Sequence, residues 1–191
     1  PASSEIVLDV ALGKGDFYDV ANYPYDDLVN AAVYWKYLNA GFRLAATGGS
    51  DNFADVWRDA PPGSARTYAR TGGRIDVPGW LEAVRAGHTF ATNGPLLRFT
   101  LAPATDSGER IEALAVGPGE ELGVGAEAGT DFVAVVDVDS VAPLDRVDLV
   151  VNGAVARTVD VRGLGRSFRL QETLELPEGG WVAAMAVGPA A

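Results

Sequence analysis

The feature that most constrains the fold is a change of sequence pattern near Asn93-Gly94-Pro95. Before this point, short apolar stretches of strand character alternate with amphipathic stretches of helical character. From about Leu96 onward, apolar runs of strand length follow one another between Gly, Pro, Asp and Ser residues. The first pattern is typical of an α/β layer or barrel and the second of a β-sandwich. We therefore predict two domains, covering residues 1–95 and 96–191.

The first half is expected to contain strands joined by helices. The expected strands are 16–20, 43–47 and 65–70, and the expected helices are about 26–40 and 76–86. Asp76 is of the residue type that caps a helix N-terminus, and Gly41 and Gly87 each follow the end of a helix, where glycine readily takes the left-handed conformation. Two or three such units cannot close a barrel by themselves.

The second half is expected to consist of strands only. They are expected at 98–101, 132–138, 146–151, 154–161, 168–176 and 181–187. Asn152-Gly153 separates two of these runs and predicts a type I′ hairpin turn, because both residues tolerate positive φ. Six or seven short strands at such spacing predict a small sandwich, whereas the Gly- and Pro-rich stretch 113–129 fits either a loop or a weak strand pair.

Charge and residue usage exclude several classes of function. The 15 basic and 26 acidic side chains give 15 − 26 = −11, which argues against nucleic acid or an anionic membrane surface as the partner. A cationic partner or a divalent metal suits this charge better. The apolar runs are far shorter than the ~20 residues of a membrane-spanning helix. We expect a soluble protein and assign it no compartment.

The cysteine and histidine content limits the possible chemistry. The chain has no cysteine, which excludes disulfides, thiolate nucleophiles and cysteine-ligated zinc. His88 is the only histidine, so a site with several histidines cannot form within this chain, and a Ser-His-Asp triad would require this residue. His88 begins an expected strand, where either a partly exposed structural histidine or a residue of the site fits the pattern.

Asp51 is the strongest candidate site residue. It ends the loop Gly48-Gly49-Ser50-Asp51, which follows a buried strand, and α/β folds expose reactive groups at such strand ends. A carboxylate there can hold a divalent metal, which lowers the pKa of bound water towards ~7 and makes it a nucleophile. The alternative is a turn aspartate that bonds its own backbone.

Other polar residues are candidates to line the same site. Asp19 lies nearer the C-terminal end of its strand than Asp16, on the opposite face, and Asn22 belongs to the loop that follows. Asn93, near the domain junction, is a candidate to position a substrate or to brace the rim of the domain. The polar segment 55–62, which contains Trp57, is expected to form a lid-like loop over the strand ends.

Several segments, taken in order, resemble the C-terminal part of the carbaryl-hydrolase-like (CehA/McbA) metallohydrolases, a group within the polymerase-and-histidinol-phosphatase (PHP) superfamily. The resemblance covers about residues 5–100 and continues more loosely beyond. The segments that carry it are 11–14 (ALGK), 16–20 (DFYDV), 34–44 (YWKYLNAGFRL), 48–51 (GGSD), 66–68 (RTY) and 85–97 (RAGHTFATNGPLL).

The resemblance implies a distorted (β/α)7 barrel whose strand ends bind two or three divalent metals through His, Asp and Glu. Metal-activated water would then hydrolyse an ester, a carbamate or a phosphoester. Asp51 matches the late metal-binding aspartate of this pattern. The sequence departs from it in two respects: it reads Asp51-Asn52-Phe53 where the superfamily has Asp-x-His, and the early His-x-His ligands have no counterpart.

Together these observations predict an α/β fold, the C-terminal portion of a PHP-type (β/α)7 barrel, followed by an Ig-like β-sandwich. We expect a fragment of a metal-dependent hydrolase that is inactive alone, with Zn, Mn or Fe and a small-molecule substrate in the complete enzyme. The N-terminal portion is expected to be missing, or another chain of an oligomer to supply it. No catalytic residue beyond the metal ligand is assigned.

The alternative is a non-catalytic binding or structural module built on the sandwich. Exposed aromatic side chains in a groove of the sandwich would favour that alternative, and a plain acidic face would not.

Overall fold

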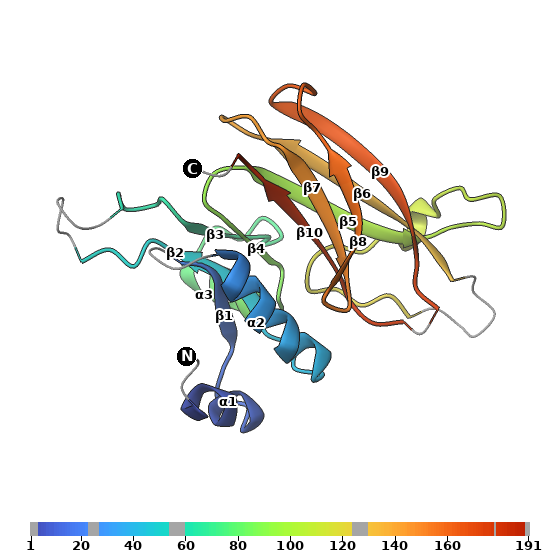
Figure 1. Ribbon diagram of the computed structural model, residues 1–191. Helices are drawn as coiled ribbons and strands as arrows, with labels where there is room; N and C mark the ends of the chain where they lie inside the picture. The colour runs from blue at the N-terminus through green and yellow to red at the C-terminus, as the bar shows by residue number, and fades with distance from the viewer. Residues whose placement is uncertain (1–3, 23–26, 54–59, 124–129, 178, 190–191) are drawn as a thin grey trace. The chain divides into compact units, whose positions relative to one another are not determined.

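The computed structural model describes residues 4–22, 27–53, 60–123, 130–177 and 179–189. The chain divides into two compact units, Pro1–Asn93 and Gly94–Ala191, and Figure 1 shows their elements. This division falls beside the Asn93-Gly94-Pro95 segment at which the sequence pattern changes. The two units are described separately below.

The predicted fold class is wrong. About 40% of the described residues are in strands and 18% in helices, and the strands form several small sheets, so the fold is β-rich and is not an α/β portion of a PHP-type (β/α)7 barrel. The physical reason is strand pairing. A barrel needs each strand parallel to its neighbours, whereas β3 (Arg66–Ala69) and β4 (Thr89–Thr92) pair antiparallel.

The first unit combines three helices with two small sheets. Its remaining elements are α1 (Ser4–Ala11), β1 (Phe17–Asn22), α2 (Asp27–Asn39), β2 (Ala45–Gly49) and α3 (Val77–Arg85). β1, α2 and β2 form a βαβ unit in which the two strands are parallel. Asp76 caps α3 as predicted, because its carboxylate accepts a hydrogen bond of 2.7 Å from the Gly79 amide. α1 has no counterpart among the elements expected from the sequence.

Threonine hydroxyls join the β3–β4 pair to β2. The Thr89 hydroxyl donates to the Ala46 carbonyl at 2.8 Å. The Thr67 hydroxyl donates to the Gly48 carbonyl and accepts from the Gly48 amide, both at 2.9 Å. We call these contacts the threonine joint. Within the described strands, these side-chain hydrogen bonds connect β2 to the β3–β4 pair. In a continuous sheet, backbone hydrogen bonds would make this connection.

An aromatic cluster forms the core beside α2. Val10, Tyr37 and Leu44 are buried there, and half-buried aromatic side chains pack around them. The Tyr34 hydroxyl donates to the Leu44 carbonyl at 2.7 Å, and burial raises the pKa of Tyr34 to about 12. Tyr18 stacks on Tyr34 with 6.0 Å between ring centroids. This cluster fixes α2 against β1 and thereby sets the position of the β1 and β2 ends.

The second unit is built from two three-stranded antiparallel sheets. One sheet has the order β10-β7-β8 and the other β5-β6-β9. The strands are β5 (Leu96–Pro103), β6 (Asp131–Asp139), β7 (Arg146–Val151), β8 (Ala154–Asp160), β9 (Ser167–Glu175) and β10 (Val182–Val187), with a short 3-10 helix η1 (Glu112–Leu114) after β5.

The inward side chains of both sheets form one core, so this unit is a β-sandwich. Alternate residues of β6 and β7 belong to this core, namely Ala134, Val136 and Val138 of β6 and Val147 and Leu149 of β7. The intervening residues Val133, Val135 and Val150 are buried as well, so both faces of these two central strands are largely covered. Asn152 and Gly153 have φ of 50° and 87° and connect β7 to β8, which confirms the predicted hairpin turn. An ion pair between Arg157 and Glu172, at 2.9 Å, links β8 of one sheet to β9 of the other.

Candidate functional site

The parallel strands β1 and β2 end at the same edge of the first unit. Asn22 pairs with Gly49 in the strand register, and Asp51 follows two residues later. The main chains approach closely here, because a Cβ on Gly48 would lie 3.0 Å from the Ala21 carbonyl oxygen and 3.2 Å from that of Arg66. Glycine at position 48 therefore allows β1 and β3 to converge just below this edge.

β4 runs in the same direction as β2 and ends at the same edge. The threonine joint places Thr89 beside Ala46, and Ala91, the strand partner of Thr67, at the level of Gly48. The residue numbers thus increase in the same direction along β4 and β2, which means that the two strands run parallel. Asn93, which is exposed and directly follows β4, consequently belongs to the edge that holds Asn22 and Asp51. We call Asn22, Asp51 and Asn93 the strand-end group.

Asp51 has the most distinctive backbone of this group. Its φ of 44° is left-handed, a conformation that costs an ordinary L-residue about 1–2 kcal/mol and that aspartate tolerates better than most. Its side chain is exposed. Strained positions of this kind are over-represented at functional sites, which makes the backbone a physical reason, independent of the sequence pattern, to single out Asp51.

Two hydrogen bonds fix the chain on either side of Asp51. The Ser50 hydroxyl accepts from the Gly63 amide at 2.8 Å, and the Asn52 side-chain amide donates to the Ala60 carbonyl at 2.6 Å. These bonds close the connection between β2 and β3 near its base. They hold the Asp51 carboxylate at the strand ends on a defined piece of backbone.

Asp19 and His88 lie away from Asp51. The Asp19 carboxylate accepts a hydrogen bond from the Thr47 hydroxyl across the β1–β2 pair, so it bridges two strands. His88 precedes β4, and its main chain bonds the Ala83 carbonyl and the Arg70 amide. Four strand residues lie between His88 and Asn93, which places the two residues five steps apart, about 17 Å at the usual rise per residue. Asn22, Asp51 and Asn93 therefore stand at or just beyond the ends of β1, β2 and β4, and His88 lies at the opposite end of β4.

The expected lid falls largely outside the described residues. Trp57 and its neighbours within 54–59 belong to the part of the chain that is not described, so the lid hypothesis stays a prediction. In the described end of the segment, the Ala60 carbonyl accepts from the Asn52 side chain and the Pro61 carbonyl accepts from the Ser64 amide.

The described residues do not group potential metal donors together. Within the described ranges, no group of three or more His, Cys, Asp or Glu residues is placed to hold a metal ion. Asp51 is the single carboxylate of the strand-end group, and two asparagine side chains add neutral carbonyl oxygens. Divalent metals take four to eight ligands, so a tight site would need further donors.

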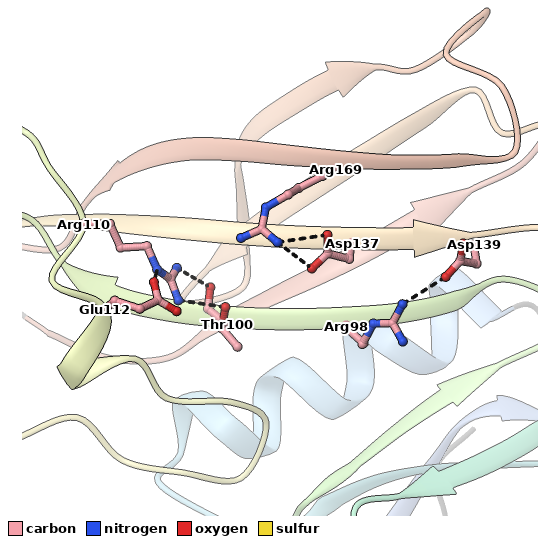
Figure 2. Close-up of polar contacts among 7 residues, drawn as sticks. All are labelled: Arg98, Thr100, Arg110, Glu112, Asp137, Asp139 and Arg169. Atoms are coloured by element: carbon pink, nitrogen blue, oxygen red, sulfur yellow. Dashed lines mark hydrogen bonds and ion pairs between the residues drawn. The ribbon is translucent and has the colours of Figure 1, made fainter.

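The outer face of the β5-β6-β9 sheet carries paired charges, as Figure 2 shows. Arg98 pairs with Asp139 at 3.1 Å, and Arg169 pairs with Asp137 at 3.3 Å. These side chains come from adjacent strands and neutralise one another. Exposed pairs of this kind contribute at most about 1 kcal/mol each, and they leave little net charge to attract an ionic partner.

Arg110 is the buried member of this polar group. Its guanidinium donates to the Thr100 hydroxyl at 2.9 Å and to Glu112 at 2.6 Å (Figure 2). It also donates to the Val133 carbonyl at 3.1 Å. It therefore fastens the segment after β5 onto two strands of the sandwich. Sequence reasoning missed Arg110, because nothing in the local pattern distinguishes a buried arginine from an exposed one.

The sandwich does not present exposed aromatic side chains. Its aromatic residues are Phe99, Phe132, Phe168 and Trp181, all of which are described, and each is buried or half-buried. The groove of exposed aromatics that would favour a binding module is therefore not found on the described surface of this unit.

Comparison with known proteins gives no relative. No protein family, curated protein or solved structure matches the chain. In the described part of the chain, no helix is both long enough and apolar enough to cross a membrane.

Proposed function

We propose that this chain contributes Asp51 to a divalent-metal site that hydrolyses an ester, a carbamate or a phosphoester. The remaining metal ligands would come from polypeptide outside the described residues. The observation that carries the proposal is the placement of Asp51, an exposed carboxylate on left-handed backbone where β1, β2 and β4 end together. The motif resemblance to the CehA/McbA metallohydrolases supports the same residue, and the proposal does not require a barrel.

The chemistry follows from the donor types. A carboxylate and nearby amide carbonyls are hard oxygen ligands that suit Mn²⁺, Fe²⁺ or Zn²⁺, and a metal held there would supply activated water. Asp51 would orient the metal, while Asn22 and Asn93 would bind a substrate carbonyl or phosphoryl oxygen through their side-chain amides. With so few donors, binding by this chain alone is expected to be weak.

The first experiment is a Mn²⁺ titration followed by NMR, which detects weak binding because the ion broadens nearby amide signals. We expect selective broadening of residues around Asp51, Asn22 and Asn93, and its loss in Asp51→Asn. Asparagine also tolerates the left-handed conformation, so this variant removes charge with little change of backbone. Asp106→Asn, at an exposed turn of the sandwich, is the matched control and should leave the broadening unchanged. Equal broadening in wild type and Asp51→Asn would rule the site out.

The second experiment tests where the other ligands reside. The purified chain, incubated with Zn²⁺, Mn²⁺ or Fe²⁺, should hydrolyse activated esters, carbamates and phosphoesters no faster than the metal in buffer. Turnover by the isolated chain that Asp51→Asn abolishes would show that all of the ligands lie within it, contrary to the proposal.

A further inference from the structure

The segment after β5 turns back and runs along the outer edge of that strand. β5 is the outermost strand of its sheet, so on one side its backbone groups face no other strand of the sheet. Val116 occupies part of this side, where its amide and carbonyl exchange hydrogen bonds of 2.9 Å with the carbonyl and amide of Leu101. The Ile111 amide also donates to the Pro103 carbonyl at 2.9 Å. We call residues 105–116 the strap.

The strap has hydrogen bonds of its own. The Thr105 amide donates to the Glu109 carbonyl at 2.7 Å and closes a turn. The Leu114 amide donates to the Ile111 carbonyl at 3.0 Å and forms part of η1. Because these bonds lie within the strap and do not involve β5, they can stay intact when the strap leaves the strand edge.

Arg110 attaches the strap to the sheet through its side chain. Figure 2 shows its guanidinium at Thr100 of β5, and the same group reaches the Val133 carbonyl of β6. The Arg110 side chain is only 9% exposed, whereas its charge partner Glu112, which also belongs to the strap, is 78% exposed. Separation of the strap from the sheet therefore moves the ion pair as a whole and leaves no unpaired charge on the sheet.

We propose that the strap opens and closes over the edge of β5 as one unit, and that Arg110 is its latch. Its attachments are local bonds at the rim of the sandwich, and breaking them costs less than unfolding the two sheets. In the open state the Leu101 amide and carbonyl are unpaired at a sheet edge, the arrangement to which a further strand can add. The inference goes beyond the proposed metal site and does not depend on it.

The test is native-state hydrogen exchange of the full chain, followed by NMR at urea concentrations below the unfolding transition. In the wild type, the amides of Leu101, Ile111 and Val116 should share one opening equilibrium. This equilibrium should be at least about ten-fold more favourable than that of the amides at the centre of β6, and it should depend less on urea because less surface becomes exposed.

Substitutions of Arg110 test the latch. Arg110→Gln removes the charged donor, so we expect the three strap-edge amides to exchange at least about ten-fold faster while the centre of β6 is unchanged. Arg110→Lys keeps the charge but lacks the planar fork that reaches two acceptors, and should give a smaller increase. The matched control is Arg98→Gln, because Arg98 belongs to β5, is 73% exposed and pairs with Asp139. It should leave the exchange of the strap-edge amides unchanged.

Three results would overturn the proposal. If the strap-edge amides exchange in the wild type only together with the centre of β6, the strap opens only when the sandwich unfolds. If these amides show unrelated opening equilibria, the strap is not a unit. If Arg110→Gln and Arg110→Lys exchange as the wild type does, or no faster than Arg98→Gln, Arg110 is not the latch. The wild-type comparison decides the first two points even if a variant does not fold.

Discussion

The backbone φ angle of Asp51 helps to decide between two explanations for this residue, a functional carboxylate and an ordinary turn aspartate. A left-handed aspartate is strained, and glycine in the same place would not be. Aspartate at a position suited to glycine lowers the stability of the fold. Such a loss of stability is expected where the carboxylate has a function. The sequence pattern alone left this choice open.

Substitutions at Asp51 should reveal the strain. We expect Asp51→Gly to equal or exceed the wild type in unfolding free energy, and Asp51→Ala to be about 1 kcal/mol less stable than Asp51→Gly. Urea unfolding of the variants measures the difference. Asp106, which is exposed and has a negative φ, is the control position. There the Gly variant should not be more stable than the Ala variant. Equal stabilities of the two Asp51 variants would mean that the left-handed backbone is absent in solution.

Tyr34 gives the structure a dependence on high pH. Its pKa is about 12 in the fold, against 10.0 for an unperturbed tyrosine, because burial disfavours the phenolate. The unfolded chain loses this proton first, so the contribution is fully present below pH 10 and is lost as pH rises towards 12. Two pH units correspond to about 2.7 kcal/mol at most.

Unfolding free energies between pH 9 and 12 test this expectation. Tyr34→Phe should be less stable than the wild type near neutral pH, by about 1 kcal/mol, because the Leu44 carbonyl loses its donor. It should also lose less stability than the wild type as the pH rises. Parallel curves for the two proteins would contradict the burial of the Tyr34 hydroxyl.

At the scale of elements, strand positions followed from apolar periodicity, but strand partners did not. The expected strand 65–70 exists as β3, yet its antiparallel pairing with β4 depends on contacts distant in sequence. The strand-end group was foreseeable in part, since Asn22 and Asp51 were expected just after two strands that a helix connects, although Asn22 proves to be the last residue of β1. The separation of His88 from Asp51 depends on the direction of β4, which no local pattern encodes.

The threonine joint makes an element-level prediction. Thr89→Val keeps the shape of the side chain and removes the donor to the Ala46 carbonyl, so we expect a loss of about 1–2 kcal/mol in unfolding free energy. Thr173→Val, at an exposed position of β9, is the control and should change stability by less than about 0.5 kcal/mol. A similar loss in both variants would show that the hydroxyl bond is not the cause.

At the scale of the whole molecule, the chain divides between Asn93 and Gly94, where the sequence changes from a mixed helical and strand pattern to a strand pattern. All of the described residues that form the sandwich core belong to the second unit. The barrel expectation came from a resemblance in short segments, which specify local turns and helices but do not determine how many parallel strands assemble.

The separate core predicts that residues 94–191 fold by themselves. We expect this piece to show a β-type circular dichroism spectrum and a single cooperative unfolding transition. Leu149→Ala, at a fully buried position of β7, should lower its stability by about 2–5 kcal/mol. A non-cooperative transition would show that the sandwich depends on the first unit.

The threonine joint has a consequence for how the first unit opens. Its few hydroxyl bonds can break while the β1–β2 and β3–β4 ladders stay whole, so the β3–β4 pair can swing away from β2 as an intact ribbon. Such an opening would be a motion of low cost compared with unfolding either pair. The Gly48 amide, which donates to the Thr67 hydroxyl across the joint, should therefore exchange with deuterium sooner than the amides at the centre of β6, which has hydrogen-bonded strands on both sides.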